Sequence, residues 1–329
     1  SLLLAMIQTE IGTDLKKAKL LLDASEIISI PTETVYGLAA NGKNPIAIAK
    51  IYAAKKRPLS NPLILHYKDA SSAFQDVTTI PKEAEILAEK FWPGPLTMLL
   101  PKSKNIPDAV TSGKSRVAIR VPRHELCLSL LNALDYPIAA PSANLYGRIS
   151  PTSSAHVHEQ LNERIPYILD GGICEKGIES TIIGFENNHV LIYRLGSISI
   201  EAIEACIRKK VHINNKIEDK KAPQASGMVK HHYAPNTAMF SIVQKHKEKD
   251  LSNCGFIGFD TLHPDFPVEN QFLLSKNGNI DTAAKELYRS FHVMDANKFK
   301  SIYIEFMPES GIGSAINDRI KRAIQKYTP

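Results

Sequence analysis

Hydroxyl, imidazole and cationic side chains gather between residues 27 and 67, each just after a predicted strand or helix. Thr32 follows one apolar run, and His66 follows a second one. Between them, apolar residues at helical spacing end in Lys55 and Arg57. If these ends converge, hydroxyls, an imidazole and fixed cations surround one site. Preorganised lysine and arginine suit an anion, in particular a phosphate or a carboxylate.

Prolines on both sides of the two cations favour such a site. Pro58 turns the chain directly after Arg57, and Pro62 precedes the second apolar run. Both prolines restrict the freedom that an ordinary surface loop would have. The alternative is that Lys55 and Arg57 only offset the dipole at the C-terminal end of a helix. The residues of this stretch leave both interpretations open.

A second polar group follows another predicted strand. The apolar run at 136–140 ends at Pro141 and leads to Ser142, Asn144 and Ser150. Small side chains after a strand let a ligand approach the backbone closely, as phosphate-binding turns require. The pattern G-x-x-x-x-G-K-S/T does not occur in the chain, so this turn is not a Walker loop.

Two arginines, Arg120 and Arg194, lie inside predicted apolar strands. A buried guanidinium group is costly unless it is paired, so each of them either meets an internal carboxylate or binds an anionic ligand. Arg194 belongs to the second of two apolar runs around Asn187, which predict a hairpin. Glu179 and Ser180 stand at the head of the first run.

A polar segment divides the chain. Residues 209–236 carry few apolar groups and predict a linker. They separate residues 1–208 from residues 237–329, where short strands alternate with helices and predict a small parallel, Rossmann-like α/β domain. A chain of 329 residues is long enough for two domains.

The end of the linker is unusual, because His231, His232 and Tyr233 gather just before Pro235. Side chains at adjacent positions do not face one site in a regular element, and neither acidic nor thiol groups lie near these histidines in sequence. We therefore predict no metal site in this protein.

Composition and charge are those of an ordinary soluble globular protein, with 43% hydrophobic and 22% charged residues. The formal net charge of +6 is compatible with anionic small molecules or with nucleic acid, and is too small to favour either. The four cysteines form no C-x-x-C pair, so neither a zinc site nor a disulfide framework is indicated. Because we recognise no signal peptide and no transmembrane span, we expect a cytoplasmic protein without a membrane partner.

Seven motifs occur together in one order. They are PTETVYGL from residue 31, KKRPLSNPL from 55, FWPGPLT from 91, VAIRVP from 117, APSAN from 140, GIESTII from 177 and YRLG from 193. Together they resemble the YrdC-like threonylcarbamoyl-AMP synthases. The segment HYAP from residue 232 and the ending GIGSAINDR from residue 311 resemble the two-domain form of that family.

The resemblance implies an α/β fold of the α+β type, in which a twisted mixed β-sheet with flanking helices encloses a positively charged cavity. It implies a nucleotidyltransferase that makes L-threonylcarbamoyl-AMP and pyrophosphate from L-threonine, bicarbonate (or CO₂) and ATP, with Mg²⁺ accompanying the ATP. A separate transferase would then pass the threonylcarbamoyl group to the adenosine beside the anticodon of certain tRNAs.

The same resemblance assigns the site residue by residue. ATP would be held by Lys55, Arg57, Asn61, Ser142, Asn144, Ser150, Arg194 and the linker residue Tyr233. L-Threonine would be held by Thr32, His66, Arg120 and Ser180. The catalytic residues at the ATP phosphates would be Lys55, Arg57, Ser142 and Asn144. The linker departs from the family pattern, because Gln224 to Met228 replace the usual Pro-Gly-Met and His231 stands where an arginine is common.

Two other interpretations stay open. A module that binds tRNA or double-stranded RNA without catalysis would use the same basic concave surface. Its cations, however, are few and lie among proline and small residues rather than exposed aromatic platforms. The second alternative is a carbamoyl-adenylate-forming domain with another acceptor. The related larger proteins carry acylphosphatase and zinc-finger segments, which this sequence lacks.

Overall fold

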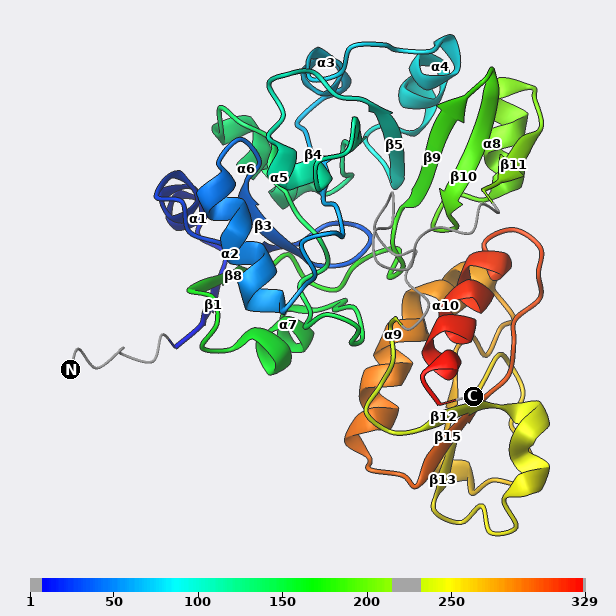
Figure 1. Ribbon diagram of the computed structural model, residues 1–329. Helices are drawn as coiled ribbons and strands as arrows, with labels where there is room; N and C mark the ends of the chain where they lie inside the picture. Colours follow the sequence, from blue (N-terminus) through cyan, green and yellow to red (C-terminus); the bar gives the residue numbers. More distant parts are fainter. Residues whose placement is uncertain (1–7, 215–231, 328–329) are drawn as a thin grey trace.

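The computed structural model describes residues 8–214 and 232–327, which form two β-sheets with helices packed against them (Figure 1). The larger sheet has the strand order β1-β8-β2-β3-β7-β4-β6-β5-β9-β10-β11. Some neighbours pair in parallel, such as β4 with β6, and others antiparallel, such as β5 with β6. The predicted mixed sheet with flanking helices is therefore confirmed.

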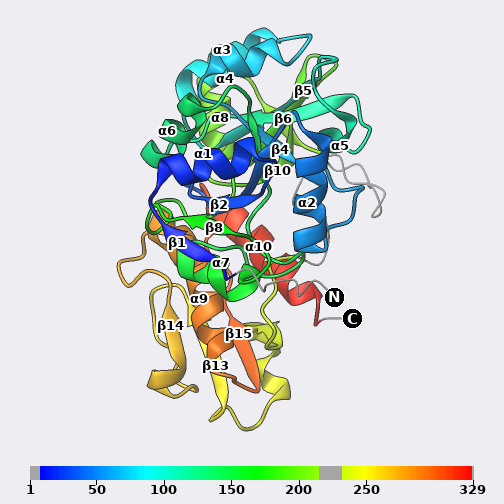
Figure 2. The same cartoon turned by 90° about the vertical axis from the view of Figure 1, so that its left-hand side faces the viewer.

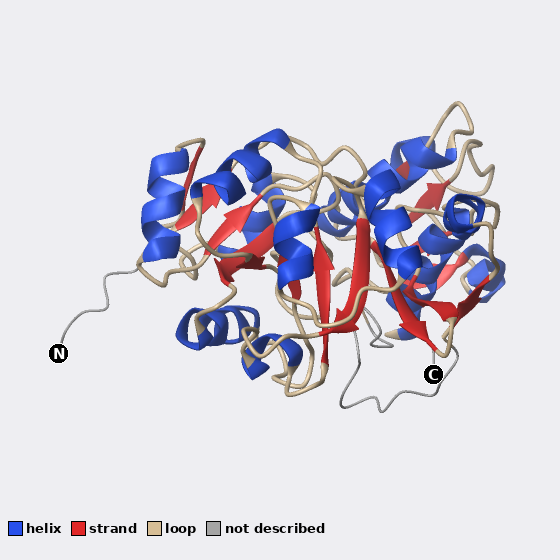
Figure 3. Ribbon diagram, turned by 90° about the horizontal axis from the view of Figure 1, so that it is seen from above, coloured by secondary structure: helices blue, strands red, loops and turns tan. Residues whose placement is uncertain are grey.

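The larger sheet is built from short strands, and helices lie on both sides of it (Figure 3). Its strands are β1 (Glu10–Gly12), β2 (Ile28–Ile30), β3 (Gly37–Asn41), β4 (Ile64–His66), β5 (Leu96–Pro101), β6 (Arg116–Arg120), β7 (Ile138–Ala139), β8 (Tyr167–Leu169), β9 (Thr181–Glu186), β10 (His189–Arg194) and β11 (Val211–Ile213). Its helices are α1 (Leu15–Asp23), α2 (Pro45–Lys55), α3 (Ala70–Gln75), α4 (Lys82–Phe91), α5 (Asp108–Thr111), α6 (Glu125–Ala133), α7 (Ser154–Leu161) and α8 (Ile200–Ile207).

Helix α2 shows how local sequence sets one element of the site. The side chain of Asn44 caps the first turn by accepting a hydrogen bond from the backbone of Ile46. Pro45 occupies the first helical position, where its fixed backbone angle favours the helix. The helix stops at Lys55, because Lys56 adopts the left-handed conformation with φ 56°. This end places the predicted cations at the start of the following loop.

The smaller sheet is wholly parallel, with the strand order β12-β15-β13-β14. Its elements are β12 (Met239–Ser241), the 3₁₀ helix η1 (Ile242–Lys247), β13 (Cys254–Gly258), the 3₁₀ helix η2 (Val268–Asn270), β14 (Gln271–Leu273), α9 (Ile280–Ala296), β15 (Ser301–Ile304) and α10 (Gly313–Gln325). This confirms the predicted parallel sheet. Within the described ranges, no helix combines the length and apolar character needed to cross a membrane.

One buried apolar cluster spans both domains. Val35, Ile149 and Ile178 of the larger domain belong to the same cluster as Leu287 and Ile316 of the smaller one. Helices α9 and α10 lie on the side of the small sheet that faces the larger domain (Figures 1 and 2). Burial of apolar surface stabilises by about 25 cal/mol per Å², so this cluster stabilises the association of the two domains.

The segment predicted to be a linker begins as a strand. Strand β11 pairs in parallel with β10 at the edge of the larger sheet. Val211 packs against the main apolar cluster, whereas His212 and Ile213 are exposed. An edge strand needs few apolar groups, which is why composition did not reveal it. The remaining linker residues 215–231, which include Gln224, Met228 and His231, lie outside the described residues.

Two histidines stack at the contact between the domains. The rings of His156 in α7 and His292 in α9 lie 3.7 Å apart and are inclined by 17°. Nε2 of His292 donates a hydrogen bond of 3.1 Å to the carbonyl oxygen of Ser150. Burial lowers the pKa of His156 to about 3 and that of His292 to about 4. Both rings are therefore neutral at neutral pH.

We expect the protein to lose stability as the pH falls from 7 to 5. Because the folded pKa of His292 lies below the ordinary value, the unfolded chain binds more protons in this window, and stability rises with pH. Relative to pH 7, protonation linked to this one ring lowers the free energy of unfolding by about 1–2 kcal/mol at pH 5. His292→Gln should show a shallower pH dependence of the urea midpoint than the wild type.

The matched control is His189→Gln, which replaces an exposed histidine. Its urea midpoints at pH 5, 6 and 7 should run parallel to those of the wild type. If His292→Gln also runs parallel, the neutral stacked pair does not contribute to acid sensitivity.

Candidate active site

The ends of the central strands converge on one pocket. Strands β4 and β6 are parallel and in register, so that His66 stands directly opposite Arg120. Thr32 follows β2, and Ser142 follows β7, which pairs with β4. These side chains line a pocket with about 480 Å³ of empty space, open solvent at its mouth included, together with Ser180, Arg194, His232 and Tyr233. The predicted convergence of strand ends is therefore confirmed.

Lys55 is directed at the turn after β7. Its side chain is 1% exposed, and Nζ donates hydrogen bonds to the carbonyl oxygens of Ser142 at 2.5 Å and Asn144 at 2.6 Å. Burial, with repulsion by Arg57, lowers the pKa of Lys55 well below its ordinary value. A lysine that only offset the helix dipole would stay in solvent, so the placement favours the interpretation as a site.

Arg57 is fixed by the loop that follows it. Its Nε donates to the carbonyl oxygen of Asn61 at 3.1 Å, and Nη2 donates to that of Pro62 at 2.8 Å. These bonds hold the guanidinium group in the interior, where burial and the more distant Arg194 lower its pKa. The prolines of this loop thus supply acceptors as well as rigidity.

Two buried asparagines retain unused polar atoms. Asn61 and Asn144 are each 1% exposed. Neither side-chain polar atom of Asn61, nor the side-chain oxygen of Asn144, has a hydrogen-bond partner among the described residues. Buried polar groups are nearly always paired, so these atoms are suited to contact a bound molecule.

Arg120 pairs with an internal carboxylate and also faces the pocket, where it can bind an anionic ligand. Its Nη2 forms an ion pair with the carboxylate of Glu33, and Nη1 donates to Oγ1 of Thr34 at 3.2 Å. Burial lowers the pKa of Arg120 to about 9, so it is charged at neutral pH. The same side chain lines the pocket, and its Nε has no partner in the described part of the chain.

His66 lies beside this arginine as a neutral ring. Burial lowers the pKa of His66 to about 4, and its Nδ1 has no partner within residues 8–214 and 232–327. Thr32 on the same wall donates a 2.6 Å hydrogen bond to the carbonyl oxygen of Val35. This wall therefore offers a cation, a neutral imidazole and a hydroxyl to a small polar ligand.

Among the described residues, Arg194 is held by Ser180. Its Nε and Nη2 donate to the carbonyl oxygen of Ser180 at 3.0 and 2.9 Å, and Nη2 also donates to Oγ at 3.0 Å. Thr97 and Ser180 share a further hydroxyl–hydroxyl bond of 2.8 Å. These hydrogen bonds fix the positions of Arg194, predicted to bind ATP, and of Ser180, predicted to bind L-threonine, relative to each other.

The site holds more buried positive than negative charge. Arg120 and Arg194 are buried and line the pocket, whereas Lys55 and Arg57 are buried near it but are not among the residues that line it. Two buried carboxylates, Glu33 and Glu179, lie beside them. Repulsion by Arg194 contributes to the lowered pKa of both Arg57 and Arg120, which shows that the cations act on one another. A ligand with several negative charges would relieve this repulsion.

The end of the linker packs into the same site. His232 is 5% and Tyr233 is 1% exposed, and both line the pocket. Burial lowers the pKa of His232 to about 3, and Lys55 and Arg57 lower it further while Glu179 opposes them. The structure thus brings the predicted linker tyrosine to the residues predicted to bind ATP.

Glu33, Glu179, Tyr288 and Arg319 take part in the site although the sequence assigned them no role in it. Both glutamates stand inside the recognised motifs, which was the available signal. Tyr288 and Arg319 lie in regular helices and had no signal of their own beyond the ending GIGSAINDR. Among the described residues, no group of three or more His, Cys, Asp or Glu side chains could hold a metal ion.

Comparison with known proteins decides the family. Residues 20–196 match a family model described as "Telomere recombination", and residues 198–324 match one described as "Threonylcarbamoyl-AMP synthase, C-terminal domain". A threonylcarbamoyl-AMP synthase of Bacillus subtilis is 39% identical over 320 residues, which cover 93% of this chain and 92% of the relative. The chain belongs to the threonylcarbamoyl-AMP synthase family.

Relatives of this synthase support the assignment over its full length. A threonylcarbamoyl-AMP synthase of Pyrococcus abyssi is 35% identical over 316 residues, covering 91% of this chain and 90% of the relative. The crystal structure of P. abyssi Sua5 complexed with L-threonine superposes with a TM-score of 0.88 at 34% identity, covering 96% of this chain and 98% of that one. Membership in a family of synthases makes the chain an enzyme, which disfavours the RNA-binding module without catalysis.

Asn61 provides a test of the site that separates binding from stability. Because its side chain makes no hydrogen bond to the described residues, Asn61→Leu should leave the melting temperature unchanged or raise it. The same variant should weaken ATP binding about tenfold or more if the amide contacts the nucleotide. Calorimetric titration with ATP and thermal unfolding of the same samples give both values.

Asn277→Leu serves as the control, since Asn277 is exposed in the smaller domain. It should leave ATP binding unaltered. Wild-type affinity in Asn61→Leu would remove Asn61 from the nucleotide site.

Proposed function

We propose that this enzyme synthesises L-threonylcarbamoyl-AMP and pyrophosphate from L-threonine, bicarbonate (or CO₂) and ATP. Its family and the L-threonine complex of the P. abyssi protein support this proposal. The product would supply a separate transferase that modifies the adenosine beside the anticodon of tRNA.

One observation carries the proposal most directly. Two buried arginines, Arg120 and Arg194, line the pocket, and the buried Lys55 and Arg57 are close enough to lower the pKa of His232, which also lines it. A triphosphate brings several negative charges, which Lys55, Arg57 and Arg194 can stabilise together. The carboxylate of an amino acid needs one cation, and Arg120 can supply it through the Nε that its bonds to Glu33 and Thr34 leave unused. The pocket therefore suits an amino acid beside a nucleotide.

The proposed chemistry consists of two bond-forming steps. The unprotonated amine of threonine adds to the carbon of CO₂, releases one proton to water and becomes a carbamate. A carbamate oxygen then attacks the α-phosphorus of ATP, the bond from that phosphorus to the bridging oxygen breaks, and pyrophosphate leaves with the electron pair. Neither step needs a protein nucleophile, so the residues act by positioning and by stabilising charge.

The residues of the site have distinct parts in this scheme. Arg120, Thr32 and His66 would hold the amino acid, and the neutral state of His66 avoids repulsion of the amine. Lys55 and Arg57 would stabilise the charge that develops on the departing pyrophosphate. Ser142 and Asn144 belong to the turn that Lys55 fixes, and this turn would hold the phosphates.

Magnesium would enter as part of the substrate. The carboxylate that lines the pocket, that of Glu179, is occupied by hydrogen bonds from Ser150, Tyr288 and Arg319. The site thus fits an anion better than a bare cation. We propose that Mg²⁺ is bound to the phosphate oxygens of ATP and offsets part of their charge.

The function is tested by measuring pyrophosphate release from ATP by the purified chain in the presence of bicarbonate and Mg²⁺. Release should require L-threonine and bicarbonate, and L-serine should be compared in parallel. Release without an amino acid would instead indicate simple ATP cleavage. No release together with no ATP binding by calorimetry would exclude the proposed reaction.

Lys55→Gln and Lys56→Gln form a matched pair for the phosphate contacts. Lys55 is buried against the turn after β7, whereas its neighbour Lys56 is exposed. Lys55→Gln should lower kcat/KM for ATP at least about 100-fold, the usual loss on removal of one preorganised stabiliser. Lys56→Gln should retain the wild-type value. Equal rates for the two variants would contradict the assignment, and circular dichroism controls for folding.

A further inference from the structure

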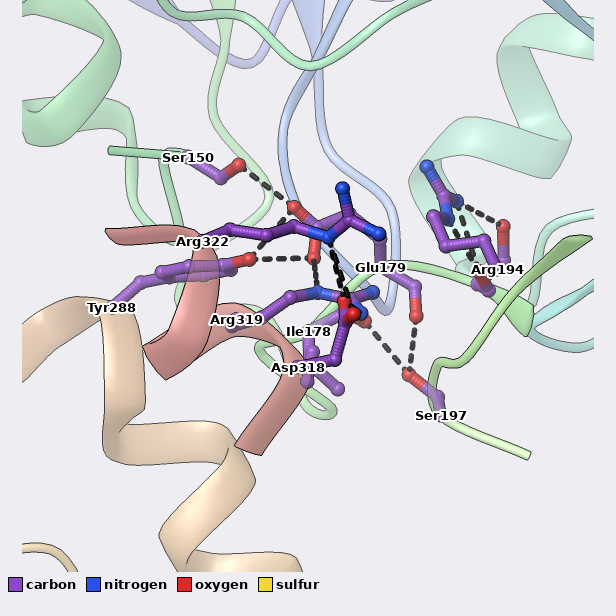
Figure 4. Close-up of polar contacts among 10 residues, drawn as sticks. Ser150, Ile178, Glu179, Arg194, Ser197, Tyr288, Asp318, Arg319 and Arg322 are labelled. Atoms are coloured by element: carbon purple, nitrogen blue, oxygen red, sulfur yellow. Dashed lines mark hydrogen bonds and ion pairs between the residues drawn. The ribbon is translucent and has the colours of Figure 1, made fainter. Parts of the chain in front are cut away.

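The smaller domain contributes buried polar groups that contact Glu179, a residue of the pocket wall (Figure 4). Tyr288 in α9 donates its hydroxyl to both carboxylate oxygens of Glu179, at 2.7 and 2.9 Å. Arg319 in α10 forms an ion pair with the same carboxylate through Nε at 3.1 Å. Glu179 itself lines the pocket from the larger domain. One carboxylate thus connects the second domain to the site.

This carboxylate is charged although it is buried. Burial opposes ionisation, but attraction by Arg319 and Arg194 and the hydrogen bond from Tyr288 outweigh it and lower the pKa of Glu179 to about 2. Arg319 is fully buried, and Asp318 accepts a hydrogen bond from its Nη1 at 3.0 Å. Arg322 donates to the same Asp318 at 3.1 Å. A network of this kind fixes the positions of all its members.

The network reaches three residues on the nucleotide side of the site. Oγ of Ser150 donates to Glu179 at 2.8 Å, while His292 of the smaller domain holds the carbonyl oxygen of the same serine. The ring of Tyr233 lies 5.8 Å from the ring of Tyr288 and 5.3 Å from the guanidinium of Arg319. The third residue, Arg194, is bonded to Ser180, which directly follows Glu179 in the chain.

Cohesion of the two domains does not explain this network. The apolar cluster that joins Val35, Ile149 and Ile178 to Leu287 and Ile316 already holds the domains together. A buried ion pair is often no more stabilising than apolar groups of the same size, because both charges lose their hydration. What the network adds is a fixed position for polar groups at the pocket wall.

We propose that Tyr288 and Arg319 are positioning residues of the nucleotide site, acting through Glu179 on Ser150. The second domain then supports the site through its contacts with Glu179. This inference rests on the proposed function, because it assumes that the site binds ATP. It predicts that loss of the contacts from α9 and α10 lowers the affinity for ATP while the melting temperature changes little.

Tyr288→Phe is the first test, because it removes the hydroxyl and retains the ring. ATP affinity by calorimetry and KM for ATP should worsen about five- to tenfold, as for the net loss of one typical hydrogen bond. The value of kcat and the melting temperature should change little. The control is Tyr303→Phe, a buried tyrosine of the same domain, which should behave like the wild type. A lower melting temperature with wild-type ATP affinity would overturn the inference.

A double-mutant cycle tests whether Arg319 acts through Glu179. Arg319→Met should weaken ATP binding in the wild-type background and have little further effect in Glu179→Gln. Independent, additive effects of the two substitutions would show that Arg319 does not act through this carboxylate. Arg319→Lys, which keeps the charge, should restore part of the affinity lost in Arg319→Met.

The outcomes for the two proposals can be told apart. If the wild type binds ATP but releases no pyrophosphate with L-threonine and bicarbonate, the proposed function fails and the affinities still decide the positioning role. If the variants bind ATP like the wild type while turnover is normal, the positioning role fails alone. No ATP binding by the wild type overturns both.

Discussion

Positive charge held away from water is the constraint on which the site depends. Lys55, Arg57, Arg120 and Arg194 are all nearly inaccessible to solvent, and burial lowers the pKa of each. The loss of hydration is offset only in part, by backbone carbonyls at the ends of strands and turns and by Glu33 and Glu179. In the proposed function, the phosphates of ATP would complete this balance with their negative charge.

Glu179 carries a negative charge beside these cations, and its carboxylate contacts both domains. Its carboxylate accepts hydrogen bonds from Ser150 of the larger domain and from Tyr288 and Arg319 of the smaller one. Apolar packing between the domains brings helices α9 and α10 close enough for these bonds to form. Domain association and site geometry are thus linked physically, since the same two helices serve both.

The buried arginines show where prediction from the sequence reached its limit. Each was expected to meet a carboxylate or to await an anionic ligand. Arg120 pairs with Glu33, which lies 87 residues away in sequence, and also lines the pocket. Among the described residues, Arg194 is held by the carbonyl and hydroxyl of Ser180. Which partner a buried cation finds depends on strand register, and no local pattern encodes register.

The sequence by itself determined most of the elements around the site and the residues at the ends of the strands. Prolines, apolar periodicity and capping residues act over a few positions, so their effect can be read locally. Only the tertiary structure decided which atoms remain unpaired, as in Asn61, and that Tyr288 and Arg319 reach Glu179 across 109 and 140 residues. These features arise from packing between distant segments, because the energy of a buried polar group depends on all its neighbours at once.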